Sequence, residues 1–509
     1  SFSETVNVSS FDTTRFVLMP AQGSSSTHAI QEVAFPSANS AYPILTLSTS
    51  DLNAIKLIES LSTDATNTFL AVLSEAVSDM NGNVVDTIAS SAALNATSFT
   101  ADTVAVTLDS ASLNMNTGVL TLGFSETVDA DTLNVTQITI RNATSGATEA
   151  FTLTAAASGT ASSDGTTIVV RIGAADLNGI KALTSLATVV GADDAYIAVS
   201  QSVIDDMQGN PLASQAGSAL QVGTFVADST RPELSSFEFD LDTRLVVLTF
   251  TETVSRDSFD ATGIQFQASA ALGSGAVVSV TSTLITQHVL SILTFELSLE
   301  DANAVKAAQA IAIDLNSTFI AMTDGTVDDM AGESVVALAN SNALVASDYT
   351  VDATEPTLDS FDLRMPTGEP PIQLTLSFSE TIDTTNLNVS GIVLQSTTAS
   401  ASASIRLTGA TVSVNSTHAP SVVHITMSTA DLATLKALES VGRSSDATFV
   451  SLDSSAAADF AGNRVEAILA SSALAVGAHT VDITPPVLVQ FTLDLSNNHL
   501  VGPLSPRIG

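Results

Sequence analysis

One short segment recurs four times along the chain, and its spacing decides what the chain can fold into. Ser1-Phe-Ser-Glu-Thr5 returns at residues 123–127, 249–253 and 377–381, so the motif glutamates lie 122, 126 and 128 residues apart. Self-similarity at a fixed period is typical of repeat proteins, in which each repeat is one supersecondary unit or small domain. The recurrence therefore predicts that the chain of 509 residues folds into four units. Each unit would have about 127 residues, which is an ordinary size for one domain.

Two further motifs recur in the same order and fix the register of the repeats. The first is a short helix signal, Asp51-Leu-Asn-Ala-Ile-Lys56, in which Leu52 and Ile55 are spaced for one helical face. It returns at 176–181, 301–306 and 431–436. The second is a turn, Asp79-Met-Asn-Gly-Asn83, matched at 206–210, 329–333 and 459–463, whose Gly and Asn residues suit positive φ.

A junction of the form Asp-x-Thr-x-Pro separates the copies. It occurs at 228–232, 352–356 and 482–486, and residues 102–106 are a degraded version of it. Proline makes such junctions short and stiff rather than flexible. The junction aspartates divide the chain into five segments: repeat 1 (1–102), which lacks its first strand, repeat 2 (103–228), repeat 3 (229–352), repeat 4 (353–482) and the tail (483–509).

Within the repeats, apolar residues alternate with polar ones. Phe237, Phe239 and Leu241 are separated by acidic residues, and Leu120, Leu122 and Phe124 are matched by the segment 374–378. This period of two predicts strands with one buried and one solvent-facing side. The expected fold class is all-β: tandem immunoglobulin-like antiparallel β-sandwiches, each with one short helix.

The Phe-Ser-Glu-Thr strand, the Asp-x-x-Gly-Asn turn and the closing Asp-x-Thr-x-Pro junction together resemble the bacterial-type Ig-like repeats of S-layer proteins, large adhesins and related surface proteins. The resemblance covers the whole chain in four copies, with Glu333 in place of Asn as one departure. It implies an extracellular structural or adhesive role and brings no catalytic residues. We therefore expect that the protein is not an enzyme.

The two ends of the chain are complementary in phase. Repeat 1 begins inside its second strand, and the tail opens with the kind of strand that repeat 1 lacks, built on Val489, Phe491, Leu493 and Leu495. A sandwich without an edge strand is a template for another chain. We therefore expect a head-to-tail homopolymer, a filament in which the tail of one subunit completes repeat 1 of the next. The alternative is a window cut from a longer array, the stalk of a large adhesin or S-layer protein.

Composition excludes several classes of function. A net charge of −38, from 53 acidic and 15 basic residues, leaves no basic surface for nucleic acid. The chain has no cysteine, which removes disulfides and thiolate chemistry. No stretch is apolar for long enough to span a membrane. The chain begins with Ser1, as expected of a processed or truncated protein. An acidic surface would keep extracellular fibres or appendages mutually repulsive.

Each repeat has one lysine and one motif glutamate. These are Glu4, Lys56, Glu126, Lys181, Glu252, Lys306, Glu380 and Lys436. One interpretation is that the lysine interacts with the dipole at the C-terminal end of the helix. Another is a partly buried Glu–Lys pair in each repeat, because strand parity turns the glutamate inward. A Lys–Asn cross-link is a third interpretation, and Glu333 interrupts its only recurrent asparagine.

Seven Asn-x-Ser/Thr sequons are candidate N-glycosylation sites, and we expect N-linked glycans in a eukaryotic secretory pathway. They are Asn7, Asn95, Asn134, Asn142, Asn316, Asn388 and Asn415. The Ser/Thr-rich stretch 395–404 is a candidate for O-linked glycans. We expect no cofactor, although the junction acids offer oxygen ligands for calcium in an adhesion module. These acids are Asp102, Asp228, Asp352 and Asp482.

Overall fold

The structure is a computed structural model of the chain. The residues it describes are 1–31, 33–34, 38–188, 193–215, 217–272, 275–365, 372–398, 403–414, 421–483, 485, 487–488, 491–496, 499–501 and 504–505. Two compact units are present: Ser1–Thr230 with Met330–Glu333, and Arg231–Asp329 with Ser334–Gly509. Each unit is considered separately below, under the names of the sequence repeats.

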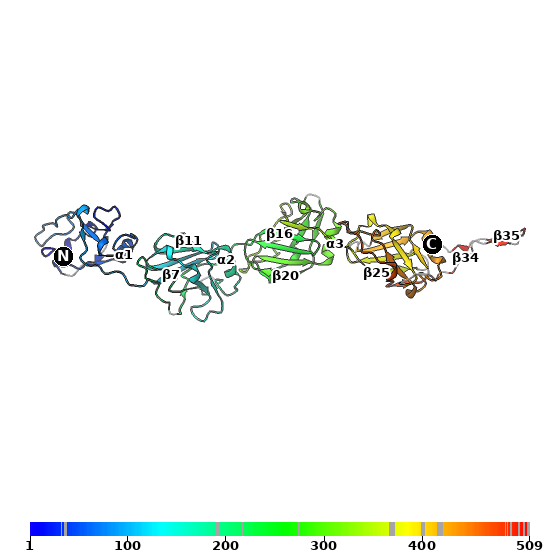
Figure 1. Cartoon of the computed structure of the whole chain (residues 1–509), viewed down its shortest axis with the longest axis horizontal. Coiled ribbons are helices and arrows are strands. Elements are labelled where there is room, and N and C mark those ends of the chain that lie inside the picture. The colour runs from blue at the N-terminus through cyan, green and yellow to red at the C-terminus, as the bar shows by residue number, and fades with distance from the viewer. Residues whose placement is uncertain are drawn as a thin grey trace. The chain divides into compact units, whose positions relative to one another are not determined.

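Repeat 3 shows the architecture most fully. One sheet has five strands in the order β20-β21-β17-β16-β24, and the other has four in the order β19-β18-β22-β23 (Figure 1). The strands are β16 (Leu234–Asp240), β17 (Leu245–Phe250), β18 (Ile264–Gln267), β19 (Val277–Ser279), β20 (Thr283–Val289), β21 (Ile292–Leu297), β22 (Phe319–Met322), β23 (Leu344–Val345) and β24 (Asp348–Thr350).

The core of repeat 3 lies between these two sheets. Phe237 and Phe239 on β16 are fully buried, while Glu238 between them is exposed. Phe239 stacks on Phe266 of the other sheet, with ring centroids 4.9 Å apart. Residues of alternating polarity thus pack two sheets face to face, which confirms the predicted β-sandwich.

Repeats 2 and 4 have the same two-sheet plan. The orders are β11-β12-β8-β7-β15 with β10-β9-β13-β14, and β29-β30-β26-β25-β33 with β28-β27-β31-β32. In repeat 2 the strands are β7 (Leu108–Asn114), β8 (Val119–Val128), β9 (Ile138–Arg141), β10 (Ala150–Thr152), β11 (Gly159–Thr160), β12 (Gly165–Arg171), β13 (Tyr196–Val199), β14 (Leu220–Gln221) and β15 (Thr224–Val226). In repeat 4 they are β25 (Leu358–Arg364), β26 (Gln373–Phe378), β27 (Ile392–Gln395), β28 (Ser404–Arg406), β29 (Ala410–Val414), β30 (Val422–Met427), β31 (Phe449–Leu452), β32 (Leu474–Ala475) and β33 (His479–Thr480).

The five-stranded sheets are not antiparallel throughout. The last strand of a repeat pairs parallel with the first: β15 with β7, β24 with β16, and β33 with β25. The predicted antiparallel sandwich therefore contains one parallel pair, at this edge of each five-stranded sheet. Both strands run in one direction because the chain crosses between the sheets before it returns to the edge of the first one.

Among its described residues, each repeat carries one α-helix of eight or nine residues: α1 (Thr49–Lys56), α2 (Ala174–Lys181), α3 (Leu299–Ala307) and α4 (Thr429–Ala437). Ser48, Ser298 and Ser428 cap their helices, each accepting a hydrogen bond from the aspartate N–H three residues later. The buried side of α1 holds Asp51 and Ile55, whereas Leu52 is exposed. Leu52 therefore does not share the buried face with Ile55, contrary to the spacing argument.

Short 3-10 helices precede or follow many strands. They span Val8–Ser10, Thr13–Arg15, Ala65–Asn67, Ser90–Ala92, Ala130–Thr132, Val135–Gln137, Arg256–Ser258, Ala261–Gly263, Leu315–Ser317, Thr384–Asn386, Val389–Gly391, Ser445–Ala447 and Ala470–Ser472. Across the described part of the chain, every helix is too short or too polar to cross a membrane.

Repeat 1 is smaller than the others. Its sheet has the order β2-β1-β5-β6, and a two-stranded β3–β4 sheet stands beside it. The strands are β1 (Phe16–Met19), β2 (His28–Ala29), β3 (Val33–Ala34), β4 (Thr46–Leu47), β5 (Phe69–Val72) and β6 (Leu94–Asn95). No five-stranded sheet occurs among the described residues of repeat 1.

The tail forms two short antiparallel pairs. Strand β34 (Val487–Leu488) pairs with β37 (Leu504–Ser505), and β35 (Thr492–Asp494) pairs with β36 (His499–Val501). In β35–β36, Asp494 is opposite His499 and Leu493 is opposite Leu500. In β16–β17, Asp240 is opposite Leu245 and Phe239 is opposite Val246. The tail hairpin therefore has the register of the first hairpin of a repeat.

Candidate functional site

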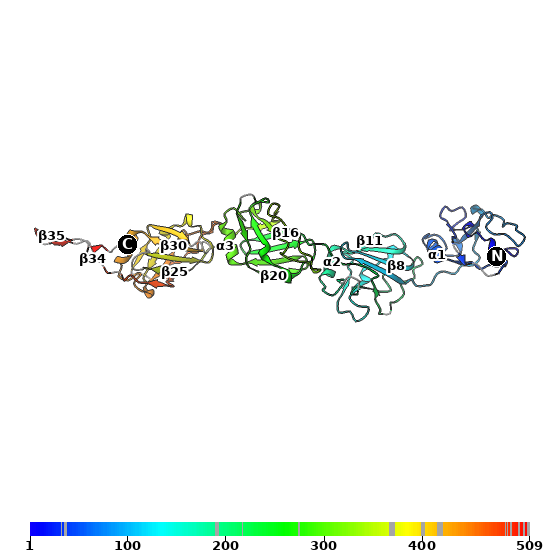
Figure 2. The same ribbon diagram turned by 180° about the vertical axis from the view of Figure 1, so that it is seen from behind.

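The recurrent motifs meet where one repeat joins the next. In the second unit, the carbonyl and side chain of Asn303 on α3 contact the Phe-Ser-Glu-Thr segment, which begins at the last residue of β26. The N–H of Thr381 donates to Asn303 Oδ1 at 3.1 Å, and its hydroxyl donates to the Asn303 backbone oxygen at 3.3 Å. Figures 1 and 2 both show α3 between the strands of repeat 3 and those of repeat 4. The first unit repeats this contact with Thr127 and Asn53, at 3.0 and 3.1 Å.

A buried lysine lies beside this contact. Lys306 Nζ is 2.8 Å from Asp352 Oδ2 and 2.6 Å from Glu380 Oε2. The three side chains are only 10%, 2% and 5% exposed. In the first unit Lys56 makes the same two contacts, with Asp102 and Glu126. We call Asn303, Lys306, Asp352, Glu380, Thr381 and Asp459 the repeat 3–4 interlock, and their counterparts Asn53, Lys56, Asp102, Glu126, Thr127 and Asp206 the repeat 1–2 interlock.

The Lys–Glu pair crosses the repeat boundary. Lys56 contacts Glu126 of repeat 2, whereas Glu4 of its own repeat is exposed. The expectation of a pair within one repeat therefore does not describe this contact. A lysine is the last or last but one residue of each helix. The helix dipole and the neighbouring carboxylates therefore both favour a positive charge at this position. Asp102 of the degraded junction takes the same role as the other junction acids.

The remaining lysines also meet junction aspartates. Lys181 Nζ is 2.8 Å from Asp228 Oδ2, and Lys436 Nζ is 2.9 Å from Asp482 Oδ2. The Lys436 and Asp482 side chains are 25% and 20% exposed, more than their counterparts at Lys306. Glu252 is buried in the second unit. At α4 the asparagine of the helix motif is replaced by Ala433.

The Asp-x-x-Gly-Asn turn holds the junction in place. In repeat 4 the Asp459 carboxylate accepts from the N–H of Asn463 and from its Nδ2, both at 2.8 Å. The Asn463 amide also donates to the backbone oxygen of Asp352 at 3.0 Å. Gly462 has φ of 93°, which confirms the expected positive φ at the turn glycine. Asn463, in contrast, stabilises the turn and the junction through the hydrogen bonds of its side chain.

Three carboxylates gather at each interlock. Oxygens of Asp352, Glu380 and Asp459 lie within 4.8 Å of one another, as do those of Asp102, Glu126 and Asp206. An oxygen-rich group of this kind suits calcium. Here the lysine ammonium contacts two of the three acids, so it supplies positive charge that a metal ion would otherwise bring. Calcium at the junction acids stays a sequence prediction.

Burial controls the protonation of this group. Loss of water raises the pKa of Glu380 to about 7, because burial and the charges of Asp352 and Asp459 outweigh the attraction of Lys306. Burial likewise raises the pKa of Asp459, against its hydrogen bonds from Asn463. Although burial alone would lower it, the two carboxylate partners raise the pKa of Lys306.

The aspartate of the helix motif has a role that sequence reasoning missed. Asp301 accepts hydrogen bonds from the N–H groups of Thr281 and Ser282, at 3.0 and 3.1 Å, and from the Thr281 hydroxyl at 2.8 Å. It thereby fixes α3 to the segment before β20. Asp301 is the last residue of a Ser-x-x-Asp pattern, the spacing of a helix cap. This pattern was the signal in the sequence that could have pointed to Asp301.

The candidate glycosylation sites lie at the surface or half-buried. Asn95, Asn134, Asn316 and Asn388 are exposed, and Asn7 and Asn142 are half-buried. Asn134 and Asn388 cap 3-10 helices through hydrogen bonds from Thr136 and Ser390. Asn415 and the donor-strand residue Val489 lie outside the described residues. The other donor-strand residues are exposed: Phe491 61%, Leu493 55% and Leu495 77%.

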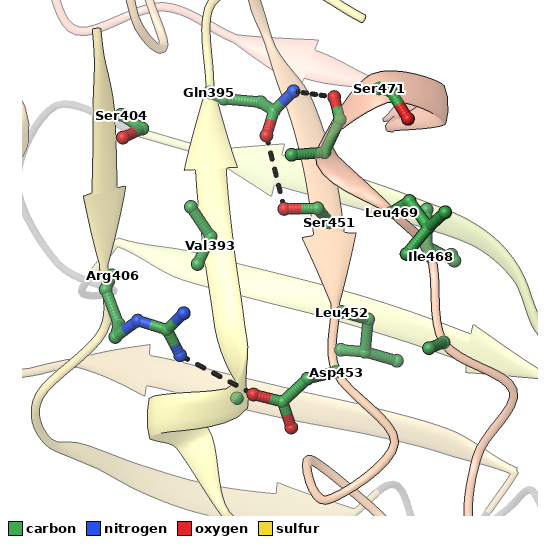
Figure 3. Close-up of a pocket in the computed structure, with 13 residues that line it drawn as sticks. Val393, Gln395, Ser404, Arg406, Ser451, Leu452, Asp453, Ile468, Leu469 and Ser471 are labelled. Carbon is green, nitrogen blue, oxygen red and sulfur yellow. Dashed lines mark hydrogen bonds and ion pairs between the residues drawn. The ribbon is translucent and has the colours of Figure 1, made fainter. Parts of the chain in front are cut away.

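An open pocket crosses the outer face of the four-stranded sheet in repeat 4 (Figure 3). Several of its polar side chains bond to one another or to the backbone. Gln395 Nε2 donates to the Ala470 oxygen at 2.7 Å, Ser451 donates to Gln395 at 3.2 Å, and Arg406 lies 3.6 Å from Asp453. Its described lining contains serines but no histidine beside them. This geometry offers no activated nucleophile.

No family model matches the chain, and a search of curated proteins found no match. Solved structures that are similar in part include a chain of the Escherichia coli adhesin FdeC, with 13% identity and a TM-score of 0.18 over 74% of this chain and 98% of that solved chain. A marsupial T cell receptor gives 8% identity and a TM-score of 0.13 over 69% and 96%. Domains 1–6 of the surface layer protein SbsC give 8% identity and a TM-score of 0.15 over 78% and 58%.

Proposed function

We propose that this chain is a non-enzymatic structural protein of a cell surface or extracellular assembly, in which interlocked repeats form a spacer or filament. The observation that carries the proposal is the repeat 3–4 interlock. Asn303 and Lys306 of one repeat bind Thr381 and Glu380 of the next through buried charged and neutral hydrogen bonds. Residues of the recurrent motifs thus serve to join copies rather than to bind a substrate.

This proposal is tested by imaging the purified chain. We expect negative-stain electron microscopy to show a narrow distribution of angles between repeats 3 and 4, and a broad one in Asn303→Ala/Glu380→Ala. Lys436→Ala, at the more exposed pair, is the matched control and should leave that angle unchanged. An antibody against repeat 4 should label intact cells of the source organism. Equal angle distributions, or labelling only after cell lysis, would contradict the proposal.

We further propose that copies join head to tail through the tail hairpin. By register, Phe491 and Leu493 of the tail correspond to Phe237 and Phe239 of repeat 3. The two repeat 3 residues are fully buried, whereas the two tail residues are exposed. Burying such side chains contributes roughly 1.5–3 kcal/mol each. The strand pairs of His499–Val501 match those of Leu245–Val247, and Phe2 bonds to Ala41 as Phe250 bonds to Ser291. A tail and a repeat 1 would therefore contribute successive parts of one strand.

Two measurements distinguish head-to-tail assembly from the alternative hypothesis. In that alternative the chain is part of the stalk of a longer protein, and the tail hairpin is the first hairpin of a further repeat. Regular filaments with a four-repeat period support head-to-tail joining, and their loss on deletion of residues 483–509 supports the role of the tail. Isolated rods at all concentrations would overturn it and favour the stalk. The glycans and the extracellular location belong to the same proposal, and mass spectrometry of native protein tests the sequons directly.

A further inference from the structure

We infer that Lys436 and Asp482 of one copy of the chain bind Glu4, Asp79 and Asn83 of a second copy. We call this contact the inter-chain interlock. The inference rests on the proposed head-to-tail joining through the tail hairpin, and it names the polar contacts that would fix one copy on the next.

The order of the pairs in a single chain points to this partner. In both described interlocks the lysine of one repeat pairs with the glutamate of the following repeat: Lys56 with Glu126, and Lys306 with Glu380. Lys436 pairs with Asp482, and no glutamate pairs with it in the described part of the chain. By the same order, the glutamate of Lys436 would belong to the repeat that follows repeat 4.

Repeat 1 carries the other half of an interlock in its usual arrangement. The Asp79 carboxylate accepts from the N–H of Asn83 at 2.8 Å and from its Nδ2 at 2.7 Å, as in the turn of repeat 4. Val6, two residues after Glu4, forms a bridge with Asp79, and its counterparts in repeats 2 and 4 do the same. The motif strand and the turn of repeat 1 are therefore already in place for a lysine.

This half of an interlock is uncovered on repeat 1. Glu4 and Thr5 are exposed, whereas the glutamates and threonines at the same motif positions of repeats 2 and 4 are buried. Met80 of the turn is 55% exposed, whereas its counterparts Met207 and Phe460 are half-buried. Repeat 1 thus exposes the side chains that are more buried at the other interlocks.

The asparagine of the turn supplies a hydrogen bond across the joint. Asn463 Nδ2 donates to the backbone oxygen of Asp352 at 3.0 Å, and the asparagine of repeat 2 donates to the junction before it at 3.1 Å. Asn83 is exposed, and its Nδ2 donates to Asp79 of its own turn. We expect its second N–H to donate to the backbone oxygen of Asp482 in the other copy.

Charge favours this pairing over other encounters between copies. Each copy has a net charge of −38, so two copies repel one another over most of their surface. Lys436 places a cation beside the junction, and its side chain is 25% exposed, compared with 10% for Lys306. Covering Lys436 with repeat 1 of another copy would exclude water and strengthen its attraction to Glu4.

One contact of the internal interlocks is missing here. Asn303 accepts the N–H of Thr381, but Ala433 occupies the corresponding position of α4. Thr5 of the second copy would therefore lack its acceptor. The inter-chain interlock should accordingly be weaker than an internal one, and Ala433→Asn should strengthen it.

Cross-linking of the full chain tests the contact directly. A carbodiimide joins a lysine amine to a carboxylate that touches it, and a mixture of chains with light and heavy nitrogen distinguishes bonds between copies from bonds within one. We expect a peptide pair that joins Lys436 of one isotope to Glu4 of the other. Lys306 is the control, because its joined peptides should carry a single isotope. Filaments without the Lys436–Glu4 pair would overturn the inter-chain interlock but leave head-to-tail joining in place, whereas a protein that gives neither would overturn both.

Charge exchange tests the pairing of positions 4 and 436. Lys436→Glu replaces the cation by another carboxylate, so the concentration needed for assembly should rise about tenfold or more. Adding Glu4→Lys to this variant should restore assembly. Arg406→Glu is the control, because it changes the net charge equally at a side chain that is 59% exposed elsewhere in repeat 4. Sedimentation velocity measures all three, and a double variant that assembles no better than Lys436→Glu would contradict the pairing.

A gain of one contact tests the position of α4. Ala433→Asn offers Thr5 of the other copy an acceptor, so the concentration needed for assembly should fall about two- to tenfold, the effect of one net hydrogen bond. Leu469→Asn, at a residue 66% exposed elsewhere in repeat 4, is the control and should change nothing. Assembly of Ala433→Asn at the wild-type concentration would contradict the placement of Thr5 against α4.

Discussion

The backbone N–H of Thr381 donates to the side-chain oxygen of Asn303, although the two residues belong to different repeats. This bond ties the middle of helix α3 in one sandwich to the segment after β26 in the next. Both partners are buried, so neither finds water when the other is removed. The bond is therefore a direct probe of how strongly two repeats are coupled.

Asn303→Ala should weaken the second unit. The Thr381 N–H loses its acceptor, and an unsatisfied buried donor costs about 1–3 kcal/mol. We expect a lower calorimetric transition temperature. Asn316→Ala is the matched control, because Asn316 is exposed on the same repeat, and it should change the transition little. Equal effects of the two substitutions would contradict a coupling role for Asn303.

The stability of the second unit should depend on pH through Glu380. Its pKa rises from the ordinary value of 4.5 to about 7 in the folded chain. Between these values the folded chain holds a proton that the unfolded chain has lost, so stability should increase as pH falls from about 7 to about 4.5. We expect a gain of ~1–3 kcal/mol.

Glu380→Gln provides the control for this pH effect. A neutral side chain at position 380 cannot titrate, so the stability of the variant should be flatter between pH 4.5 and 7 than that of the wild type. Melting temperatures across this range measure both. A wild-type curve with no steeper slope than the variant would rule out Glu380 as the titrating group.

Lysines 306 and 436 should differ in their contribution to stability. Lys306→Ala leaves Asp352 and Glu380 buried without their cation, which costs about 3–5 kcal/mol. Lys436→Ala affects a pair that is 25% and 20% exposed, and about 1 kcal/mol or less is expected there. Chemical denaturation of both variants compares the two losses within the second unit, which holds both lysines. A larger loss at Lys436 would contradict the burial argument.

Substitutions in the tail should separate assembly from folding. Phe491→Ser/Leu493→Ser removes two exposed apolar side chains from the tail hairpin. We expect filaments to be lost, with the melting temperatures of the two units unchanged. Leu469→Ser is the control, because Leu469 is 66% exposed elsewhere in repeat 4. Light scattering and electron microscopy measure the outcome, and filaments that persist in the double variant would exclude the hairpin as the joining surface.

Local patterns in the sequence predict the strands, the helices and the order of the motifs well. Phe237 and Phe239 alternate with acids, and the helix motif 301–306 lies within α3 (Leu299–Ala307). The partner of a lysine is a different problem, because Lys306 lies 54 residues after Glu252 and 74 before Glu380. Only the fold, in which the helix ends beside the next repeat, decides which of the two glutamates becomes the partner of Lys306. The role of the Asp301 carboxylate was missed because its partners, on Thr281 and Ser282, lie 20 and 19 residues earlier in the chain.

The parallel pairing of the first and last strands of a repeat has a mechanical consequence. In repeat 3 the chain enters just before β16 and leaves just after β24, and the two strands run side by side in the same direction. Tension applied to the two ends of the repeat therefore pulls these strands in opposite directions along their length. The hydrogen bonds between them share that load together in shear, instead of opening one after another as in a zipper. A protein built in this way resists stretching at the strands through which the force enters and leaves.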